Sequence, residues 1–397
     1  MLATAAAVWT LHLLSDPMAL TLAGTPAGYY LGPAPAQPDR YIIHLQGGGW
    51  GISYEDLAER ASTHYGTSAH WTRSGTCPDA SNPACWGDSP SGLPDGLQSL
   101  DADQSPLFYS AQHVYVAYSD GASFSGARVE PYVYNSTLSL YFRGYYILNA
   151  VLDDLHARFN LSTATEVLLK GCSAGGMAVY LHADHIGQRL RQWAPGVRYA
   201  AAPGAGLFLD QKAFPINASF SDLLLWGYTA QNASGSTNAA CAAAHAATHD
   251  AHLCYLAPHV LPYIATPLFI SNSLVDSCAL AELMELGCDP RVAGNCTAAQ
   301  LQYVSQYRAS MLEVVRPVLA ANALHGAFLQ ACWTHIVEDD AVAWGKTLVQ
   351  GQTQRDTFGA WWSSLWKGSS SSAPLSKVVV DGEWGSNPTC NNLGDCD

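Results

Sequence analysis

The chain has 397 residues, of which 49% are hydrophobic, so it is long enough to bury a sizeable core and is not mainly disordered. Its formal net charge of −14 argues against a nucleic-acid partner, because phosphate binding depends on clusters of Lys and Arg. No run of apolar residues reaches the ~18 to 20 that a membrane span requires, so we expect no membrane span.

The first 24 residues are interpreted as an N-terminal segment that precedes the main domain. Residues 1–14 are apolar but lack a basic start and a clear small-x-small cleavage site. This pattern leaves two interpretations open, the remnant of a signal sequence or a first β-strand. Residues 25–397 contain neither an internal repeat nor an interdomain linker, and they therefore indicate a single domain.

A glycine-rich turn follows the first clear strand. The sequence DRYIIHLQGGGWG, from Asp39, predicts a strand over 41–45 that runs into three glycines and Trp50. Backbone N–H groups of such a turn can form an oxyanion hole, because only a bare backbone comes within hydrogen-bond reach of a tetrahedral oxyanion. A tight turn without a role is the alternative, although three glycines exceed what such a turn requires.

A helix over 54–65 and a long loop over 66–110 come next. The loop is rich in Gly, Ser, Pro and Asp and contains Cys77 and Cys85. A loop of this length in a compact domain is usually functional or disordered, and a disulfide within it favours a functional loop.

A polar loop over 119–126 extends from the next strand, HVYVAY at 113–118. Ligands of open α/β sheets bind outside the carboxyl ends of the strands. We therefore expect Asp120, Ser123 and Phe124 of this loop to line a substrate cleft together with Trp50. A solvated turn is the competing interpretation.

The stretch EVLLKGCSAGGMA at 166–178 follows a helical segment over 138–159 and predicts a strand, a sharp turn and a helix. It contains the pattern G-x-S-x-G, in which Ser173 occupies the tip of a strained turn and close backbone contacts require Gly171 and Gly175. The N–H groups at the start of the following helix face any negative charge that develops at the serine. A glycine-rich turn with a buried serine would also match this five-residue pattern, but the flanking strand and helix favour a nucleophile elbow.

Candidates for an acid and a base follow the elbow. Asp276 lies just past an apolar strand, TPLFISNSL at 266–274, where the acid of a catalytic triad belongs. It could equally begin a turn or cap a helix at Ala279. After a long amphipathic helix over 301–324, both His325 and His335 could be the base.

Strands that alternate with helices, including further strands over 197–202 and 377–380, predict a mostly parallel sheet flanked by helices. The chain order Ser173, Asp276, His335 is that of α/β-hydrolase triads. In such a triad the imidazole accepts the serine proton, and the aspartate fixes the imidazole tautomer and stabilises the imidazolium. We therefore expect a single α/β-hydrolase-like domain with long loops pinned by disulfides.

Eleven cysteines are unusual for a reducing cytosol. Four close pairs predict local disulfides: Cys77/Cys85, Cys241/Cys254, Cys288/Cys296 and Cys390/Cys396. Cys172 is the expected free thiol. A working triad brings Asp276 and His335 together, so we also expect a bridge between their neighbours Cys278 and Cys332. Five N-x-S/T sequons indicate the secretory route as well: Asn135, Asn160, Asn217, Asn232 and Asn295.

His245, His249 and His252 stand at helical spacing in an Ala-rich segment. Two histidines four apart can bind zinc, but Ala246 stands where a metalloprotease requires glutamate, and the chain has no C-x-x-C pair. A surface helix is the favoured interpretation, and we expect neither a metal nor another cofactor.

Several segments together resemble the pectin acetylesterase family, which includes the animal carboxylesterase Notum. The matching segments are TPAGYYLG at 25–32, LQGGGW at 45–50, YSDGASFSG at 118–126, FRG at 142–144, GCSAGG at 171–176, GLFLD at 206–210, TPLFISNSLVDS at 266–277 and CWTH at 332–335. The resemblance implies a Ser173 nucleophile, an Asp276 acid and a base at His335 rather than His325. It also implies an oxyanion hole formed by the backbone of Gly48, Gly49 and Ala174.

The sequence departs from the family's pattern at four positions. Gly51 and Ser119 stand where the family usually has cysteines, which is consistent with one lost disulfide. Gln46 replaces a glutamate before the triple glycine, and Ala122 replaces a glycine after the aspartate. These changes leave the triad whole and bear on substrate preference. The acidic net charge does so too, because pectin is itself a polyanion.

The prediction is a secreted serine esterase that removes acetyl groups from extracellular or cell-wall polysaccharide through an acyl-enzyme. We expect it to be a monomer. One alternative is a Notum-like esterase for a longer acyl chain, which would require an apolar pocket beside Ser173. Another is a catalytically silent wall-binding relative, against which the presence of all three triad candidates argues.

Overall fold

A computed structural model describes residues 9–71, 95–214, 219–336, 338–366, 375–390 and 393. One large sheet dominates these residues. Its strands are β1 (Thr10–Leu13), β2 (Gly28–Leu31), β3 (Gln37–Leu45), β4 (Ala111–Val116), β7 (Glu166–Cys172), β8 (Arg198–Gly204), β9 (Phe269–Ser273), β10 (Gly326–Gln330) and β13 (Val378–Val380). Two short hairpins pair β5 (Tyr132–Val133) with β6 (Ser139–Leu140), and β11 (Leu348–Val349) with β12 (Gln352–Thr353).

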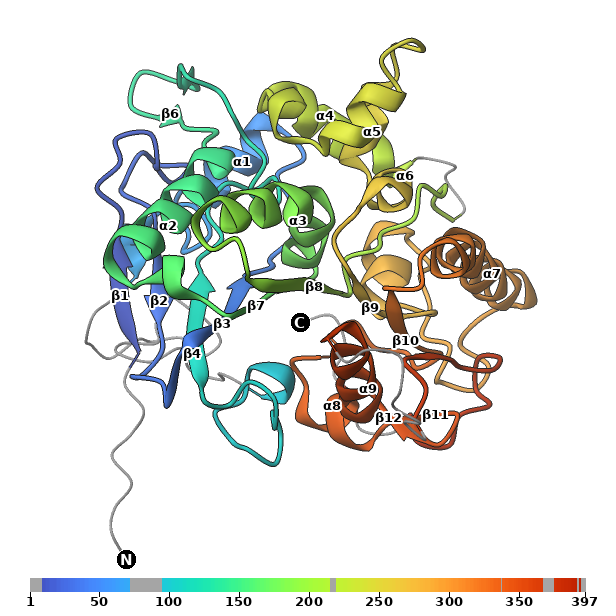
Figure 1. Cartoon of the computed structure of the whole chain (residues 1–397). Coiled ribbons are helices and arrows are strands. Elements are labelled where there is room, and N and C mark those ends of the chain that lie inside the picture. The colour runs from blue at the N-terminus through green and yellow to red at the C-terminus, as the bar shows by residue number, and fades with distance from the viewer. Residues whose placement is uncertain are drawn as a thin grey trace, which may run out of the picture.

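The sheet is mostly parallel. Within the described residues its strand order is β1-β2-β4-β3-β7-β8-β9-β10-β13 (Figure 1). Every neighbouring pair from β4 to β13 is parallel, and β2 is antiparallel to both β1 and β4. The predicted α/β fold is thereby confirmed. β1 lies within the apolar N-terminal segment, where it adds an edge strand to the sheet.

Helices cover both faces of the sheet. They are α1 (Tyr54–Arg60), α2 (Gly144–Arg158), α3 (Ala174–Trp193), α4 (Phe220–Ala230), α5 (Ala239–Ala244), α6 (Ala257–Val260), α7 (Ala298–Ala321), α8 (Ala341–Lys346) and α9 (Gln354–Trp366). Figure 1 shows α2 and α3 on one side of the sheet and α8 and α9 on the other. No helix in the described part of the chain is long and apolar enough to cross a membrane.

The strands contribute side chains to two hydrophobic cores, one on each face of the sheet, because successive side chains of a strand point to opposite sides. Ile43 of β3 and Leu169 of β7 belong to the core that includes α2, α3 and α7. Ile42 and Leu168, one position earlier, belong to the second core with aromatic side chains of α9. Both faces of the central strands are buried, which explains their nearly continuous apolar sequences.

Several helices begin or end where local chemistry dictates. α7 starts earlier than expected because Thr297 and Gln300 form a capping box. α2 starts later than expected, because Ser139 and Leu140 are taken up by β6.

The histidine-rich segment forms no single helix. α5 ends before His245, and His249 has a φ of +58°, so the three histidines do not share a helical face. His245 Nδ1 lies 2.9 Å from the Asp250 carboxylate. Cys241, the nearest thiol candidate for a metal site with His245, is in a disulfide. The expected surface helix is wrong beyond the end of α5.

Two of the disulfides in the described part of the chain join close sequence neighbours, and a third joins distant segments. The bridges Cys241–Cys254 and Cys288–Cys296 are confirmed. Cys390 is bonded to Cys332 rather than to Cys396, because β13 runs beside β10 and brings the C-terminal tail next to the loop after β10. Cys278 is disulfide-bonded, but not to Cys332 as expected. Cys172 is a buried free thiol, as predicted. The predicted pair Cys77/Cys85 lies outside the described residues.

Candidate active site

Ser173 lies in a sharp turn between β7 and α3. Its backbone has a φ of +59° and a ψ of −125°, a conformation that costs a non-glycine residue about 1–3 kcal/mol and persists only where surrounding contacts enforce it. One such contact is the hydrogen bond of 3.0 Å from Ser173 N–H to the Gly204 carbonyl. A Cβ on Gly171 would lie 2.3 Å from the Gly175 carbonyl oxygen, and one on Gly175 would lie 2.0 Å from that of Leu45. The close crossing of β3, β7 and α3 therefore requires both glycines.

The glycine-rich loop after β3 lies against this turn. A Cβ on Gly47 would lie only 3.0 Å from the Cβ of Ser173, so the loop and the serine are in close contact. Gly48 and Gly49 have φ values of +133° and +67°, which L side chains rarely adopt. The three glycines are therefore needed for close approach and for backbone conformation.

Two side chains hold the carbonyl groups of this loop. Arg60 Nη2 donates to the Gly48 oxygen and Tyr118 Oη donates to the Gly49 oxygen, each at 2.8 Å. Within the described residues, no hydrogen bond uses the backbone N–H of Gly48, Gly49 or Ala174 as its donor. Backbone donors beside a nucleophile and without another partner are what an oxyanion hole requires.

Asp276 and His335 lie together beyond the carboxyl ends of β9 and β10. His335 Nδ1 is 2.9 Å from both carboxylate oxygens of Asp276, and both side chains are buried. Because the carboxylate can only accept, Nδ1 carries the proton of the neutral imidazole and Nε2 is the basic nitrogen. His335 Nε2 has no hydrogen-bond partner among the described residues, Ser173 included. Asp276 Oδ1 also accepts from Ala279 N–H at 3.0 Å, so the same carboxylate caps the following turn.

His325 lies at the opposite edge of the sheet, just before β10 begins. Its Nδ1 accepts a hydrogen bond of 3.0 Å from Leu268 N–H, and its Nε2 lies 3.2 Å from Asn322 Nδ2. Burial, assisted by the Lys377 ammonium, lowers the pKa of His325 to about 4. His325 is therefore a neutral structural residue, remote from the carboxyl ends where Asp276 lies.

An aromatic wall lies beside His335. The Phe208 ring is 6.0 Å from the His335 ring and 4.7 Å from the Trp50 ring, and the Phe220 ring is 5.2 Å from that of Trp50. Trp50 Nε1 donates to Ser123 Oγ at 2.8 Å, which fixes the orientation of the indole. Trp50, predicted to line the cleft, is half-buried in this wall.

The other three predicted cleft residues are buried beneath the site. Asp120, Ser123 and Phe124 are each at most 1% exposed. Asp120 accepts hydrogen bonds from the backbone N–H groups of Phe124 and Ser125, at 3.1 and 3.2 Å. Ser123 Oγ donates to the Ala174 carbonyl at 2.8 Å. The structure therefore places these side chains as supports for the loop and for the start of α3, and the expectation that they face a substrate needs correction.

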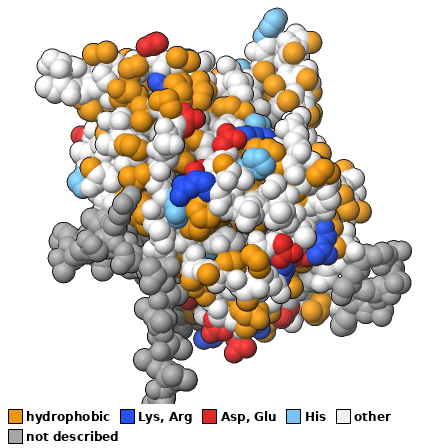
Figure 2. Space-filling model, turned by 60° about the vertical axis from the view of Figure 1, so that its left-hand side comes forward, with side chains coloured by type: hydrophobic (Ala, Val, Ile, Leu, Met, Phe, Trp, Pro, Cys, Tyr) orange, Lys and Arg blue, Asp and Glu red, His pale blue; other side chains and the backbone are white. Residues whose placement is uncertain are grey.

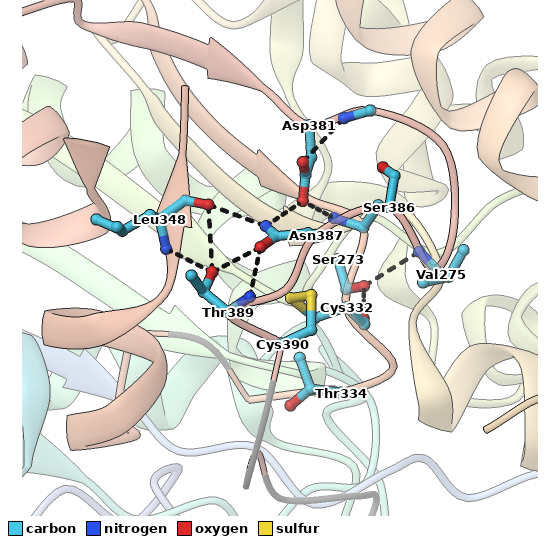
Figure 3. Close-up of a disulfide and its surroundings, with 12 residues drawn as sticks. Ser273, Val275, Cys332, Thr334, Leu348, Asp381, Ser386, Asn387, Thr389 and Cys390 are labelled. Atoms are coloured by element: carbon cyan, nitrogen blue, oxygen red, sulfur yellow. Dashed lines mark hydrogen bonds between the residues drawn. A yellow bond between two sulfur atoms is a disulfide. The ribbon is translucent and has the colours of Figure 1, made fainter. Parts of the chain in front are cut away.

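The loop that carries His335 is anchored at its start by the Cys332–Cys390 disulfide (Figure 3). Ser273 Oγ, at the end of β9, donates to the Cys332 carbonyl at 2.5 Å and accepts from Val275 N–H at 3.1 Å. One hydroxyl group thus joins the segment before Asp276 to the segment before His335.

Sequence reasoning did not single out Arg60, Tyr118 or Phe208. Tyr118 and Phe208 lie inside segments that resemble the family, and this was a usable signal. Arg60 lies at the last position of α1 and belongs to no motif. Only the tertiary structure brings it to the Gly48 carbonyl.

The parallel sheet, the strained serine turn after a central strand and the Asp–His pair beyond later strands define an α/β-hydrolase-like protein. The sequence model of the pectinacetylesterase family matches residues 2–391, and the chain belongs to this family. Membership of this family supports esterase activity for the chain.

Individual relatives agree with this assignment. The chain is 30% identical to pectin acetylesterase 11 of Arabidopsis thaliana over 317 residues, which are 77% of this chain and 73% of that protein. It is 25% identical to palmitoleoyl-protein carboxylesterase NOTUM of Mus musculus over 339 residues, 82% of this chain and 62% of that protein. The structure of the Wnt deacylase Notum from Drosophila has a TM-score of 0.78, covering 96% of this chain and 99% of that chain at 21% identity.

Proposed function

We propose that this protein is a secreted serine esterase that removes acetyl groups from extracellular or cell-wall polysaccharide. The observation that carries the proposal is the 2.9 Å contact of His335 Nδ1 with the Asp276 carboxylate, at the same sheet edge as the strained Ser173 turn. The names of the plant relatives, pectin acetylesterases, support an acetyl ester as substrate.

In the proposed reaction, His335 Nε2 takes the proton of Ser173 Oγ as that oxygen attacks the ester carbonyl carbon. Asp276 keeps Nδ1 protonated and stabilises the imidazolium that forms. Collapse of the tetrahedral intermediate breaks the bond to the sugar oxygen, which receives the proton from His335. Water then attacks the acetyl-serine by the same route and releases acetate.

The negative charge of each tetrahedral intermediate falls on the former carbonyl oxygen. The N–H groups of Gly48, Gly49 and Ala174 are the proposed donors to this oxygen. The N–H groups of Gly49 and Ala174 are already oriented, because each shares a peptide group with a carbonyl that is held. Arg60 donates to the Gly48 carbonyl, and Met177 N–H donates to the Ser173 carbonyl. Donors that are fixed in advance need no reorganisation during the reaction, and each is worth on the order of 10²–10³ in kcat.

A second candidate is an esterase for a longer acyl chain, as the names of the NOTUM relatives state for those proteins. The aromatic wall of Trp50, Phe208 and Phe220 favours it, because apolar rings beside His335 would suit an acyl chain longer than acetyl. The two candidates share one reaction and differ in chain length.

Secretion and a monomeric state belong to the same proposal. Disulfides persist in oxidising compartments, and Cys241–Cys254, Cys288–Cys296 and Cys332–Cys390 support such a compartment. Expression with a cleavable secretion signal and light scattering of the secreted product would measure both properties.

A panel of p-nitrophenyl acetate, butyrate and palmitate, followed by acetate release from acetylated pectin and acetylated xylan, tests the function. We expect the acetate ester to be the best of the three and S173A to lower its turnover by on the order of 10⁴ to 10⁶, because the nucleophile is lost while the oxyanion hole remains. A preference for palmitate would favour the second candidate. Near-full turnover by S173A would refute the serine mechanism.

A further inference from the structure

An ion pair between a fully buried lysine and a partly exposed aspartate lies beneath the proposed active site, on the face of the sheet covered by α8 and α9. Lys170 is fully buried, and its Nζ is bonded to Asp339 Oδ1. Lys170 stands on β7 shortly before Ser173, and Asp339 stands shortly after His335. A lysine is almost never fully buried unless it is paired, so this position in a central parallel strand calls for a specific role.

The neighbouring Glu338 is packed against the backbone of the serine turn. Its side chain is 2% exposed, and neither carboxylate oxygen has a hydrogen-bond partner among the described residues. A Cβ on Gly204 would lie 1.7 Å from Glu338 Oε1. Gly204 is the residue whose carbonyl accepts the hydrogen bond from Ser173 N–H, so Glu338 and Ser173 contact the same peptide segment.

The backbone of Glu338 is held as tightly as its side chain. Its carbonyl oxygen accepts a hydrogen bond of 2.9 Å from Leu97 N–H. Gly96 has a φ of +61°, and a Cβ on it would lie 2.0 Å from the same oxygen. The loop after His335 therefore enters a tightly fitted site between β7, β8 and the segment around Gly96.

Groups from every neighbouring element determine the charge of this site. Lys170 and Cys172 lie near it on β7, His44 on β3, Tyr115 on β4 and Asp339 in the loop itself, and the charge of Glu338 also acts on Tyr180 of α3. Burial, with help from the Lys170 ammonium, lowers the pKa of His44 to about 3, and burial raises the pKa of Cys172 well above its usual value. Both are therefore neutral near pH 7.

The two carboxyl groups of the site differ in protonation. Although burial acts to raise it, the Lys170 ammonium brings the pKa of Asp339 below its usual value. Burial, followed by the charge of Asp339, raises the pKa of Glu338 to about 8. Below that pH one ammonium faces one carboxylate and the site is neutral overall.

We propose that Lys170, Asp339 and Glu338 form a clamp that positions the loop carrying His335 over Ser173. This inference rests on the proposed serine esterase function. β7 carries both Lys170 and Ser173 on a rigid strand, so a loop tied to Lys170 is also placed relative to the nucleophile. The Cys332–Cys390 bridge ties the same loop before His335, and the clamp ties it after His335.

The clamp residues are positioning residues, because they act on the reaction only through His335. Displacing a catalytic group by about 1 Å can cost ~10²-fold in rate without weakening substrate binding. Loss of the clamp should therefore lower kcat and leave KM unchanged.

The double variant K170M/D339L tests the ion pair, because it removes both charges and leaves neither partner buried alone. We expect a folded protein with a kcat on p-nitrophenyl acetate about 10- to 100-fold lower and an unchanged KM. The matched control is R291M/D289L, which removes the partly exposed Arg291–Asp289 pair. It should keep the wild-type kcat. A folded K170M/D339L variant with wild-type kcat would overturn the clamp.

The single variant E338Q tests the third member and keeps the proposal falsifiable if the double variant does not fold. Ionisation of Glu338 would place two carboxylates against one ammonium, so the wild-type kcat should decline as pH rises through about 8. E338Q, which is nearly isosteric and cannot ionise, should lose this alkaline decline. The control is E383Q, which changes an exposed glutamate, and it should retain the alkaline decline in kcat. A decline that persists in E338Q, or that is absent from the wild type, would contradict this role.

A measurement without substrate separates the clamp from the proposed function. The pKa of Glu338 rises from 4.5 to about 8 on folding, so its neutral form stabilises the fold fully below about pH 4.5, and this contribution is lost as pH rises to about 8. The Tm of the wild type relative to E338Q should therefore fall across that range, whether or not any ester is cleaved. A constant Tm difference would contradict the buried, neutral Glu338 that the clamp includes, whereas a wild type inert on every ester would refute only the proposed function.

Discussion

The two histidines show how the same residue type takes different roles at opposite edges of one sheet. His335 follows β10 and faces the Asp276 carboxylate, which leaves Nε2 as the basic nitrogen. His325 precedes β10 and satisfies the Leu268 N–H with its Nδ1. One strand therefore separates a proposed catalytic base from a structural histidine.

Substitution of each histidine by alanine should separate the two roles. H335A should lower kcat by on the order of 10⁵ to 10⁶, because the base is lost. H325A should keep kcat but lower the free energy of unfolding by about 1–3 kcal/mol, because the Leu268 N–H loses its partner. Ester hydrolysis and urea denaturation measure the two effects. Loss of turnover in H325A with an active H335A would reverse the assignment.

The loops at the carboxyl ends of the strands are held by contacts between distant elements. The Cys332–Cys390 bridge joins the loop after β10 to the C-terminal tail, and Asn387 of that tail donates to both Asp381 and the Leu348 carbonyl (Figure 3). The Cys288–Cys296 bridge closes only a short local loop. The former bridge supports the element that carries His335, and the latter does not.

Removal of these two bridges should have unequal effects. In the chain-entropy description, closing a loop of 58 residues contributes about 4 kcal/mol and closing one of 8 residues about 2.5 kcal/mol. We therefore expect C332A/C390A to lose more stability than C288A/C296A, and we expect only the former to lower kcat. Thermal unfolding and ester hydrolysis at 25 °C would check both. A kcat loss confined to C288A/C296A would contradict the anchoring of the His335 loop.

The molecule as a whole is acidic, with 18 Lys and Arg against 32 Asp and Glu. On the face shown in Figure 2, Lys and Arg side chains are few and scattered, and several lie near Asp or Glu side chains. Arg60, Arg128 and Arg143 lie near the predicted cleft loops and donate to the backbone carbonyls of Gly48, Ala230 and Val129. These guanidinium groups are thus engaged in internal contacts.

This charge distribution predicts how salt affects different substrates. Repulsion between the protein and a dense array of free carboxylates is screened beyond a Debye length of about 8 Å at physiological ionic strength. On acetylated, de-esterified pectin, kcat/KM should therefore rise with added NaCl, while hydrolysis of neutral acetylated xylan should barely change. Salt inhibition on pectin alone would contradict the charge argument and indicate a basic substrate path.

The sequence by itself determined the parts of this protein that depend on local patterns. Apolar strands that alternate with helical segments predicted the parallel sheet. The glycines around Ser173 predicted the strained turn, because their lack of a side chain is what the crossing of β3, β7 and α3 demands. Cys241 with Cys254, and Cys288 with Cys296, are close enough in sequence to be paired by spacing alone.

Only the tertiary structure decided which distant residues meet. Cys332 pairs with Cys390 because β13 runs beside β10, and Asp120, Ser123 and Phe124 are buried because their loop packs under α3. The same is true of Lys170, whose partner Asp339 lies far along the chain. The physical reason is that a local sequence pattern records only the preference of a segment for helix or strand. The partner of a buried charge or thiol comes from another segment that the packing places next to it, and no local pattern encodes that partner.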